Sequence, residues 1–180
     1  MKKENKMKKI YVLLVFVLLP NMFFAQQSVL DKFDGAEDVK SILVTKKMFQ
    51  MMGNVKMDSN DKEMQQFINL TKKLDNLKVF RSSNPKVKSE LKSTADQYLV
   101  SAGLTELMRV REGSQNIKIA VKSIGNGSQV KELLMLIEDS GVSNETVLMS
   151  LTGNFDLNEL AVLTDKMNLP GGAVLSKTQK

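Results

Sequence analysis

The residue types on which most enzymes and metal sites depend are missing from this chain of 180 residues. It contains no histidine and no cysteine. Serine–histidine triads, cysteine nucleophiles, histidine bases and almost all zinc sites therefore lack the residues that form them. A carboxylate pair, a serine–lysine dyad, a lysine Schiff base and a calcium site remain. The sequence predicts a protein that is not an enzyme and holds no cofactor.

Two segments match the spacing of a serine–lysine dyad, in which serine begins a helix and lysine follows one turn later. They are Ser83–Lys86 and Ser128–Lys131. Only the first precedes an expected helix. Neither is accompanied by the S-D-N and K-T-G motifs of penicillin-recognising enzymes. We therefore interpret Ser83 as a helix N-cap and not as a nucleophile.

The acidic residues do not form a recognisable site either. The segment Asp58–Glu63 resembles a calcium loop, but Glu63 stands at the sixth position, where the turn needs glycine. A solvated loop leading into a helix is the better interpretation. Three other acidic pairs are expected at the ends of helices and strands: Glu37/Asp38, Glu138/Asp139 and Asp156/Glu159. The alternative, a hydrolase using carboxylates alone, needs two of them to face each other across a cleft.

Five methionines cluster within seventeen residues: Met48, Met51, Met52, Met57 and Met64. Thioether sulfur is a soft ligand that suits Cu(I). Methionine also fills irregular gaps in a core. Because no histidine or cysteine supplements the cluster, packing is the favoured interpretation.

One candidate binding surface remains, on two neighbouring strands. Arg109 and Arg111 alternate with apolar residues on the first strand, and Lys118 and Lys122 do so on the second. A turn at Gly113 places Arg109 opposite Lys118 on the outward face of the sheet. Like charges directly across a ladder repel each other.

Glu106, Glu132, solvent or a bound anion must relieve that repulsion. The hypothesis is a cationic sheet face that docks an anionic surface, such as lipid headgroups or the acidic patch of an envelope protein. The alternative is a normally solvated face, because exposed charges usually need no ligand.

Residues 1–25 have the parts of a signal peptide. A lysine-rich start precedes the ten apolar residues Ile10–Leu19, and Ala25 offers a small residue for cleavage. The apolar run falls short of the ~20 residues that span a bilayer. We expect a Sec-type signal, export to the periplasm or the medium, no lipid anchor, no disulfides and no transmembrane span after cleavage. An uncleaved anchor is the alternative.

The basic excess of the chain lies mostly in this first segment. The whole chain has 26 basic and 20 acidic residues, and residues 1–25 hold five lysines and one glutamate. The remainder has 21 basic and 19 acidic residues, a net charge of +2. Nucleic-acid binders use a broad basic field to neutralise phosphates, so nucleic acid is not expected as a partner.

The remaining pattern predicts an α+β fold of one domain. Residues 26–36 form a lead-in, 37–168 the domain and 169–180 a flexible tail. The expected strands span residues 39–45, 77–81, 104–111, 116–124, 130–138 and 145–152. Helices are expected over 46–52, after an Asn60–Glu63 capping box, after Pro85, and after an Asp156–Glu159 capping box. The order β-α-α-β-α-β-β-β-β-α indicates a two-layer sandwich, a mostly antiparallel sheet with helices on one face.

Five segments carry a resemblance to a known family: Ser41–Phe49, Leu77–Phe80, Glu106–Val110, Glu132–Leu136 and Leu148–Leu157. Over residues 30–168 the chain resembles exported Gram-negative proteins of the Bacteroidetes type, known as the domain of unknown function DUF4252. The resemblance implies an envelope location and no assigned activity. It also implies a setting near extracytoplasmic sigma-factor systems, and it supplies no functional residues.

Three functions stay open. The leading hypothesis is a non-enzymatic envelope protein that binds a partner, in envelope stress signalling. The alternative is a periplasmic carrier of a small apolar ligand or metal, and the third is the carboxylate hydrolase. A deep apolar pocket would favour the carrier, whereas a closed core with an exposed apolar or charged face would favour the interaction module.

Overall fold

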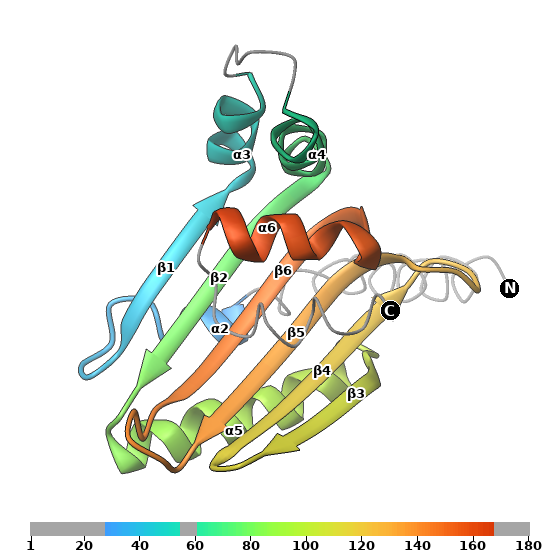
Figure 1. Ribbon diagram of the computed structural model, residues 1–180. Coiled ribbons are helices and arrows are strands. Elements are labelled where there is room, and N and C mark those ends of the chain that lie inside the picture. The colour runs from blue at the N-terminus through green and yellow to red at the C-terminus, as the bar shows by residue number, and fades with distance from the viewer. Residues whose placement is uncertain (1–27, 55–60, 168–180) are drawn as a thin grey trace, which may run out of the picture.

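A six-stranded antiparallel sheet forms the centre of the protein (Figure 1), in the order β1-β2-β6-β5-β4-β3. The computed structural model describes residues 28–54 and 61–167. The strands are β1 (Lys40–Thr45), β2 (Leu74–Ser82), β3 (Thr105–Glu112), β4 (Gln115–Ser123), β5 (Gln129–Asp139) and β6 (Thr146–Asp156). The helices are α2 (Ser28–Asp31), α3 (Lys46–Gly53), α4 (Lys62–Thr71), α5 (Pro85–Ser101), the 3₁₀ turn η2 (Leu157–Glu159) and α6 (Leu160–Lys166). The predicted α+β class and antiparallel sheet are confirmed.

Helices lie over both faces of the sheet, where the sequence analysis placed them on one. Side chains alternate between the two faces along a strand, and β5 is apolar on both. Leu134 and Leu136 pack beneath α5 and α2, on what we call the α5 face. Leu133 and Met135 belong to the cluster on the opposite face, the α6 face, to which α3 and α4 also contribute. Figure 1 shows α5 behind the sheet and α6 in front of it.

The packed part of the chain begins before residue 37, the predicted start of the domain. Leu30 and Phe33 fall within the predicted lead-in, yet both are buried on the α5 face. The Phe33 ring lies 5.7 Å from the ring of Phe80, centroid to centroid. Burying two large apolar side chains makes this segment part of the core. The predicted signal peptide and tail lie outside the described residues.

Polar side chains begin the helices, although not always the expected ones. The N-cap of α5 is Asn84 and not Ser83, because the Asn84 side chain accepts from the backbone N–H groups of Lys86 and Val87. Asp61 caps α4 by accepting from Met64, whereas the predicted Asn60 lies outside the described residues. The capping box of Asp156 and Glu159 is confirmed at η2.

A close backbone approach makes Gly153 necessary where β6 meets the start of β2. A Cβ atom at this position would collide with the Lys73 carbonyl oxygen and lie 2.9 Å from Leu74 Cα. The same Lys73 carbonyl accepts from the N–H of Asn154. The backbone therefore has little freedom to move away.

We expect Gly153→Ala to destabilise the protein by about 1–3 kcal/mol, the usual cost of overpacking a rigid site. Urea unfolding monitored by circular dichroism measures the change. Gly127→Ala is the matched control, because no atom lies within 4 Å of a Cβ there. Equal stability of the two variants would show that the backbone at Gly153 relaxes freely.

Candidate functional site

The predicted cationic residues lie on the face of the sheet that α5 covers. The register confirms that Arg109 lies opposite Lys118. The sequence analysis predicted that this face points outward to solvent. That prediction was wrong, because α5 packs on this face. A Glu106 oxygen lies 2.7 Å from Arg109 Nη2, and Lys118 Nζ lies 2.6 Å from Asp96 Oδ1 on α5. Glu106 was one of the alternatives expected to relieve this repulsion, whereas Asp96 could be recognised only once α5 was placed.

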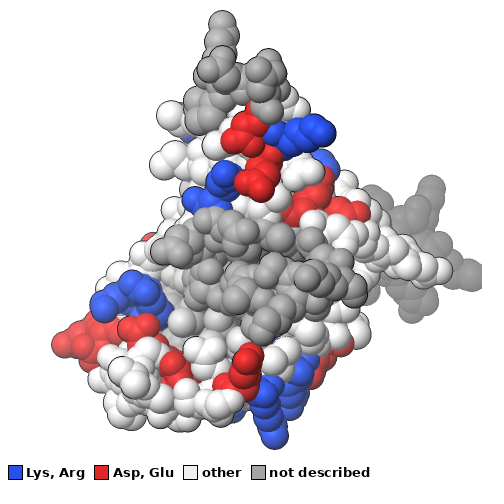
Figure 2. All heavy atoms as spheres, in the orientation of Figure 1, with Lys and Arg blue, Asp and Glu red and all other residues white. Residues whose placement is uncertain are grey.

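The other two predicted cations differ in their surroundings. Lys122 Nζ donates to the Ala102 carbonyl oxygen just beyond α5, at 3.0 Å. A cation at this end of a helix is favourable, because the last carbonyl groups carry partial negative charge. Arg111 is exposed and lies opposite Asn116 in the register. Figure 2 shows the opposite side of the molecule, the α6 face, around which basic and acidic side chains are interspersed.

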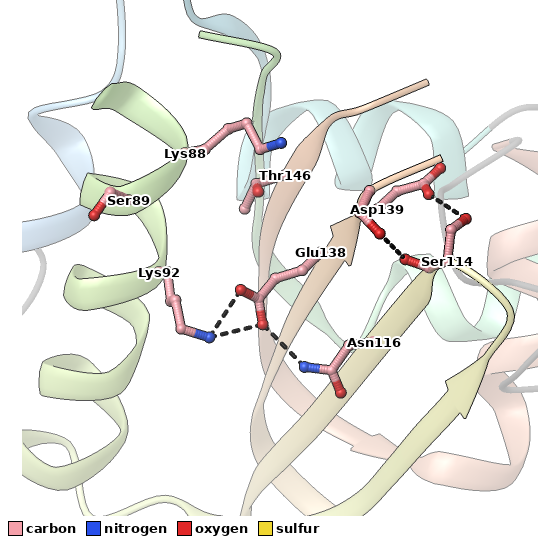
Figure 3. A pocket seen from close by; sticks show the side chains of 9 residues that line it. Lys88, Ser89, Lys92, Ser114, Asn116, Glu138, Asp139 and Thr146 are labelled. Atoms are coloured by element: carbon pink, nitrogen blue, oxygen red, sulfur yellow. Dashed lines mark hydrogen bonds and ion pairs between the residues drawn. The ribbon is translucent and has the colours of Figure 1, made fainter. Parts of the chain in front are cut away.

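A polar recess opens where α5 passes the ends of the strands (Figure 3). Its volume is about 400 Å³. Asn116, the residue opposite Arg111 on the neighbouring strand, lines the recess. The lining residues come from α5, from β4 with its preceding turn, and from the β5 and β6 ends: Lys88, Ser89, Lys92, Ser114, Asn116, Glu138, Asp139, Ser140 and Thr146.

An ion pair crosses the recess from helix to sheet. Lys92 Nζ donates to both Glu138 carboxylate oxygens, at 2.8 and 2.7 Å. Asn116 Nδ2 donates to the same carboxylate at 2.9 Å. Lys88 instead donates to two neutral oxygens of Asn144, the carbonyl at 3.1 Å and Oδ1 at 2.7 Å. Figure 3 shows Lys88 and Lys92 reaching from α5 toward the strands.

Asp139 is held ionised at the rim of the recess. Its carboxylate accepts from Ser114 Oγ at 2.6 Å, from Ser143 Oγ, and from the Gly141 N–H at 2.8 Å. The hydrogen bond from Ser114 is the largest cause that lowers the pKa of Asp139 from 3.8 to about 2. A carboxylate with so low a pKa is a weak general base near neutral pH.

A second polar cluster is buried under the other half of α5. Glu132 is 8 % exposed, and its Oε1 accepts from Tyr98 Oη at 2.8 Å and Ser150 Oγ at 3.3 Å. Burial and the neighbouring Glu132 charge raise the pKa of the Tyr98 hydroxyl. Glu132 lies opposite Lys122 in the register. It was one of the predicted partners for Arg109 and Lys118, which pair with Glu106 and Asp96 instead.

The methionine cluster divides between core and surface. Met52 packs against the α6-face cluster, as expected of a gap-filling residue. Met48 and Met51 are 51 % and 60 % exposed. Met57 lies outside the described residues. Across residues 28–54 and 61–167, no group of three or more acidic side chains could hold a metal ion.

The predicted acidic pairs lie at element ends, in structural roles. Asp38 accepts from Asn84 Nδ2 at 2.7 Å, just before α5. Asp156 caps η2 and also accepts from Ser128 Oγ, the serine of the second S-x-x-K match. Glu159 pairs with Lys73. These contacts give Asp38, Asp156 and Glu159 structural partners at the element ends.

Sequence reasoning missed the contribution of α5 to the recess. Lys88, Lys92 and Asp96 are spaced four residues apart and therefore lie along one side of the helix. That spacing was a usable signal. The strand partner of each could not be read from it, because the crossing path of α5 was unknown.

The sheet with helices over both faces defines the class of this protein as an α+β sandwich. A model of the family described as Domain of unknown function (DUF4252) matches residues 33–163. The chain therefore belongs to this family, as the resemblance indicated. Searches of curated proteins and of solved structures found no match. Within the described ranges, no helix has the length and apolar character that crossing a bilayer requires.

Removing the Tyr98 hydroxyl tests the buried cluster. We expect Tyr98→Phe to destabilise the protein by about 1.5–3 kcal/mol, because Glu132 loses its shorter hydrogen bond in a buried site. Urea unfolding at neutral pH measures the loss. Ser93→Ala removes an exposed hydroxyl from the same helix and should change stability by less than about 0.5 kcal/mol. Equal effects of the two variants would contradict a special role for Tyr98.

The lowered pKa of Asp139 predicts an acid dependence of stability. Between pH ~4 and ~2 the unfolded chain binds more protons at this carboxyl than the folded chain does. The stabilising contribution is therefore present above pH ~4 and is lost as pH falls through ~2. Asp139→Asn should be less stable than the parent at neutral pH, and the difference should shrink toward pH 2. Urea midpoints at pH 7, 4, 3 and 2 measure this difference in stability. Glu37→Gln, at an exposed position, is the charge control. A difference that does not vary with pH contradicts the lowered pKa of Asp139.

Proposed function

We propose that this protein is an exported, non-enzymatic envelope protein that binds a partner protein at the edge of its sheet. The observation that carries the proposal is the exposed apolar surface of β1 and α3. An extended segment of the partner pairs with β1 and extends the sheet. Main-chain hydrogen bonds supply affinity in this mode, and alternate side chains supply specificity. Envelope stress signalling is the setting that the family resemblance suggests.

The two edges of the sheet differ in how they are protected against pairing. β3 carries charged side chains along its length and has a bulge between Glu106 and Met108. Charges and bulges are the usual devices that keep an edge strand from pairing with another chain. β1 carries a single charge, Lys40 at its start, and its register with β2 is continuous. The less protected edge is the one suited to a partner.

Large apolar side chains gather beside that edge. Ile42 and Leu43 on β1 are 48 % and 40 % exposed, and the exposed Met48 and Met51 lie on α3, which follows directly. Other exposed large apolar residues, Val100, Leu107 and Val142, lie on separate elements. Ile42 and Leu43 point to opposite faces of the edge strand, where the alternate side chains of an added strand would meet them, and methionine adapts well to different partners.

Site-specific photocrosslinking in the cells that naturally produce the protein tests the proposal. A photoreactive phenylalanine analogue replaces Leu43 in one variant and Leu107, on the β3 edge, in the matched control. We expect a discrete adduct of higher mass from position 43 and none from position 107. Adducts of equal yield at both positions, or none at either, contradict the proposal.

A charge on the edge provides the second test. Ile42→Lys is expected to lower the crosslinking yield at position 43 by about tenfold or more, because pairing would bury an unmatched charge. The side chain at this position is nearly half exposed, so the fold should tolerate lysine. Circular dichroism checks folding. Unchanged yield from a folded variant would show that the partner does not pair with β1.

A further inference from the structure

The recess beside α5 lies at the ends of β4, β5 and β6 and includes no residue of β1 or α3. We infer that it binds a small oxyanion, a molecule with a carboxylate or phosphate group, at the ammonium groups of Lys88 and Lys92. Its volume of about 400 Å³ lies within the range of small-molecule sites. The inference does not depend on the proposed partner-binding edge.

The acidic side chains of the recess already have their hydrogen-bond donors. Glu138 accepts three hydrogen bonds, two from Lys92 and one from Asn116. Asp139 accepts from two serine hydroxyls and a backbone N–H. A cationic ligand would have to compete with these donors for the carboxylate oxygens.

The two lysines of the recess, in contrast, can still donate hydrogen bonds to a ligand. Lys88 is held by the two oxygens of Asn144, neither of which carries a formal charge. Its positive charge is therefore not neutralised by these contacts. Lys92 has a carboxylate partner, but an ammonium group has three N–H donors. Each ammonium group makes two of these contacts and so keeps a third donor for an oxyanion.

The spacing of the two lysines favours a shared ligand. Lys88 and Lys92 are one turn apart on α5, so their side chains leave the same side of the helix about 5–6 Å apart at Cβ. Both reach across the recess toward the strands in Figure 3. Two flexible ammonium groups on one side of a helix can contact different oxygens of one carboxylate or phosphate.

Nuclear magnetic resonance titration of the folded protein tests the inference. Sodium acetate and sodium phosphate are added in separate experiments, with sodium chloride at matched ionic strength as reference. We expect saturable amide shifts concentrated at the recess, in the residues around Lys88 and Thr146, from one or both oxyanions. Shifts equal to those in chloride, or shifts centred elsewhere, overturn the inference.

Charge variants give effects of opposite sign. Lys88→Gln should weaken binding of the oxyanion by about three- to tenfold, whereas Lys88→Arg should retain it. Glu138→Gln should tighten binding, because it keeps an acceptor for Lys92 while removing the competing negative charge. Lys86→Gln is the matched control, an exposed lysine on the same helix outside the recess. Equal weakening in Lys86→Gln and Lys88→Gln, or no tightening in Glu138→Gln, would show non-specific attraction and overturn the site.

Discussion

The constraint on which the structure depends is the burial of its central strands on both faces. In β5, Leu133 to Ile137 are five consecutive buried apolar residues, and β6 lies between β5 and β2. A strand that is apolar on both faces needs packing partners on both. α5 and α2 supply one cover, and α6 with α3 and α4 contributes to the other. Helices of the described residues therefore pack on both faces of these strands.

The path of α5 then decides which polar groups meet. This helix connects β2 to β3, which lie near opposite edges of the sheet, so it must cross the α5 face. Its apolar side, with Leu91 and Ala95, packs on the strands. Lys92 and Asp96 pair with Glu138 and Lys118 on the sheet. The helix therefore neutralises part of the sheet's charge and also forms one wall of the recess.

The two candidate binding surfaces, the β1 edge and the recess beside α5, differ in the side chains that they expose. β1 exposes Ile42 and Leu43 and pairs on one side only among the described strands, which suits another polypeptide. The recess is polar, with its carboxylates engaged and its lysines able to accept an anion. The low pKa of Asp139 makes it a weak base toward Ser114. Binding is the function that we propose for both surfaces.

The sequence by itself determined the strands, the pairing of β3 with β4 and the α+β class, because these depend on local periodicity and turn residues. It predicted Arg109 opposite Lys118 for the same reason. The buried run of β5 was visible too, and it could have indicated cover on both faces. The partners Asp96, Lys92 and Glu138 were decided by tertiary structure alone. They come from elements far apart in the chain, and only the crossing of α5 over the sheet brings them together.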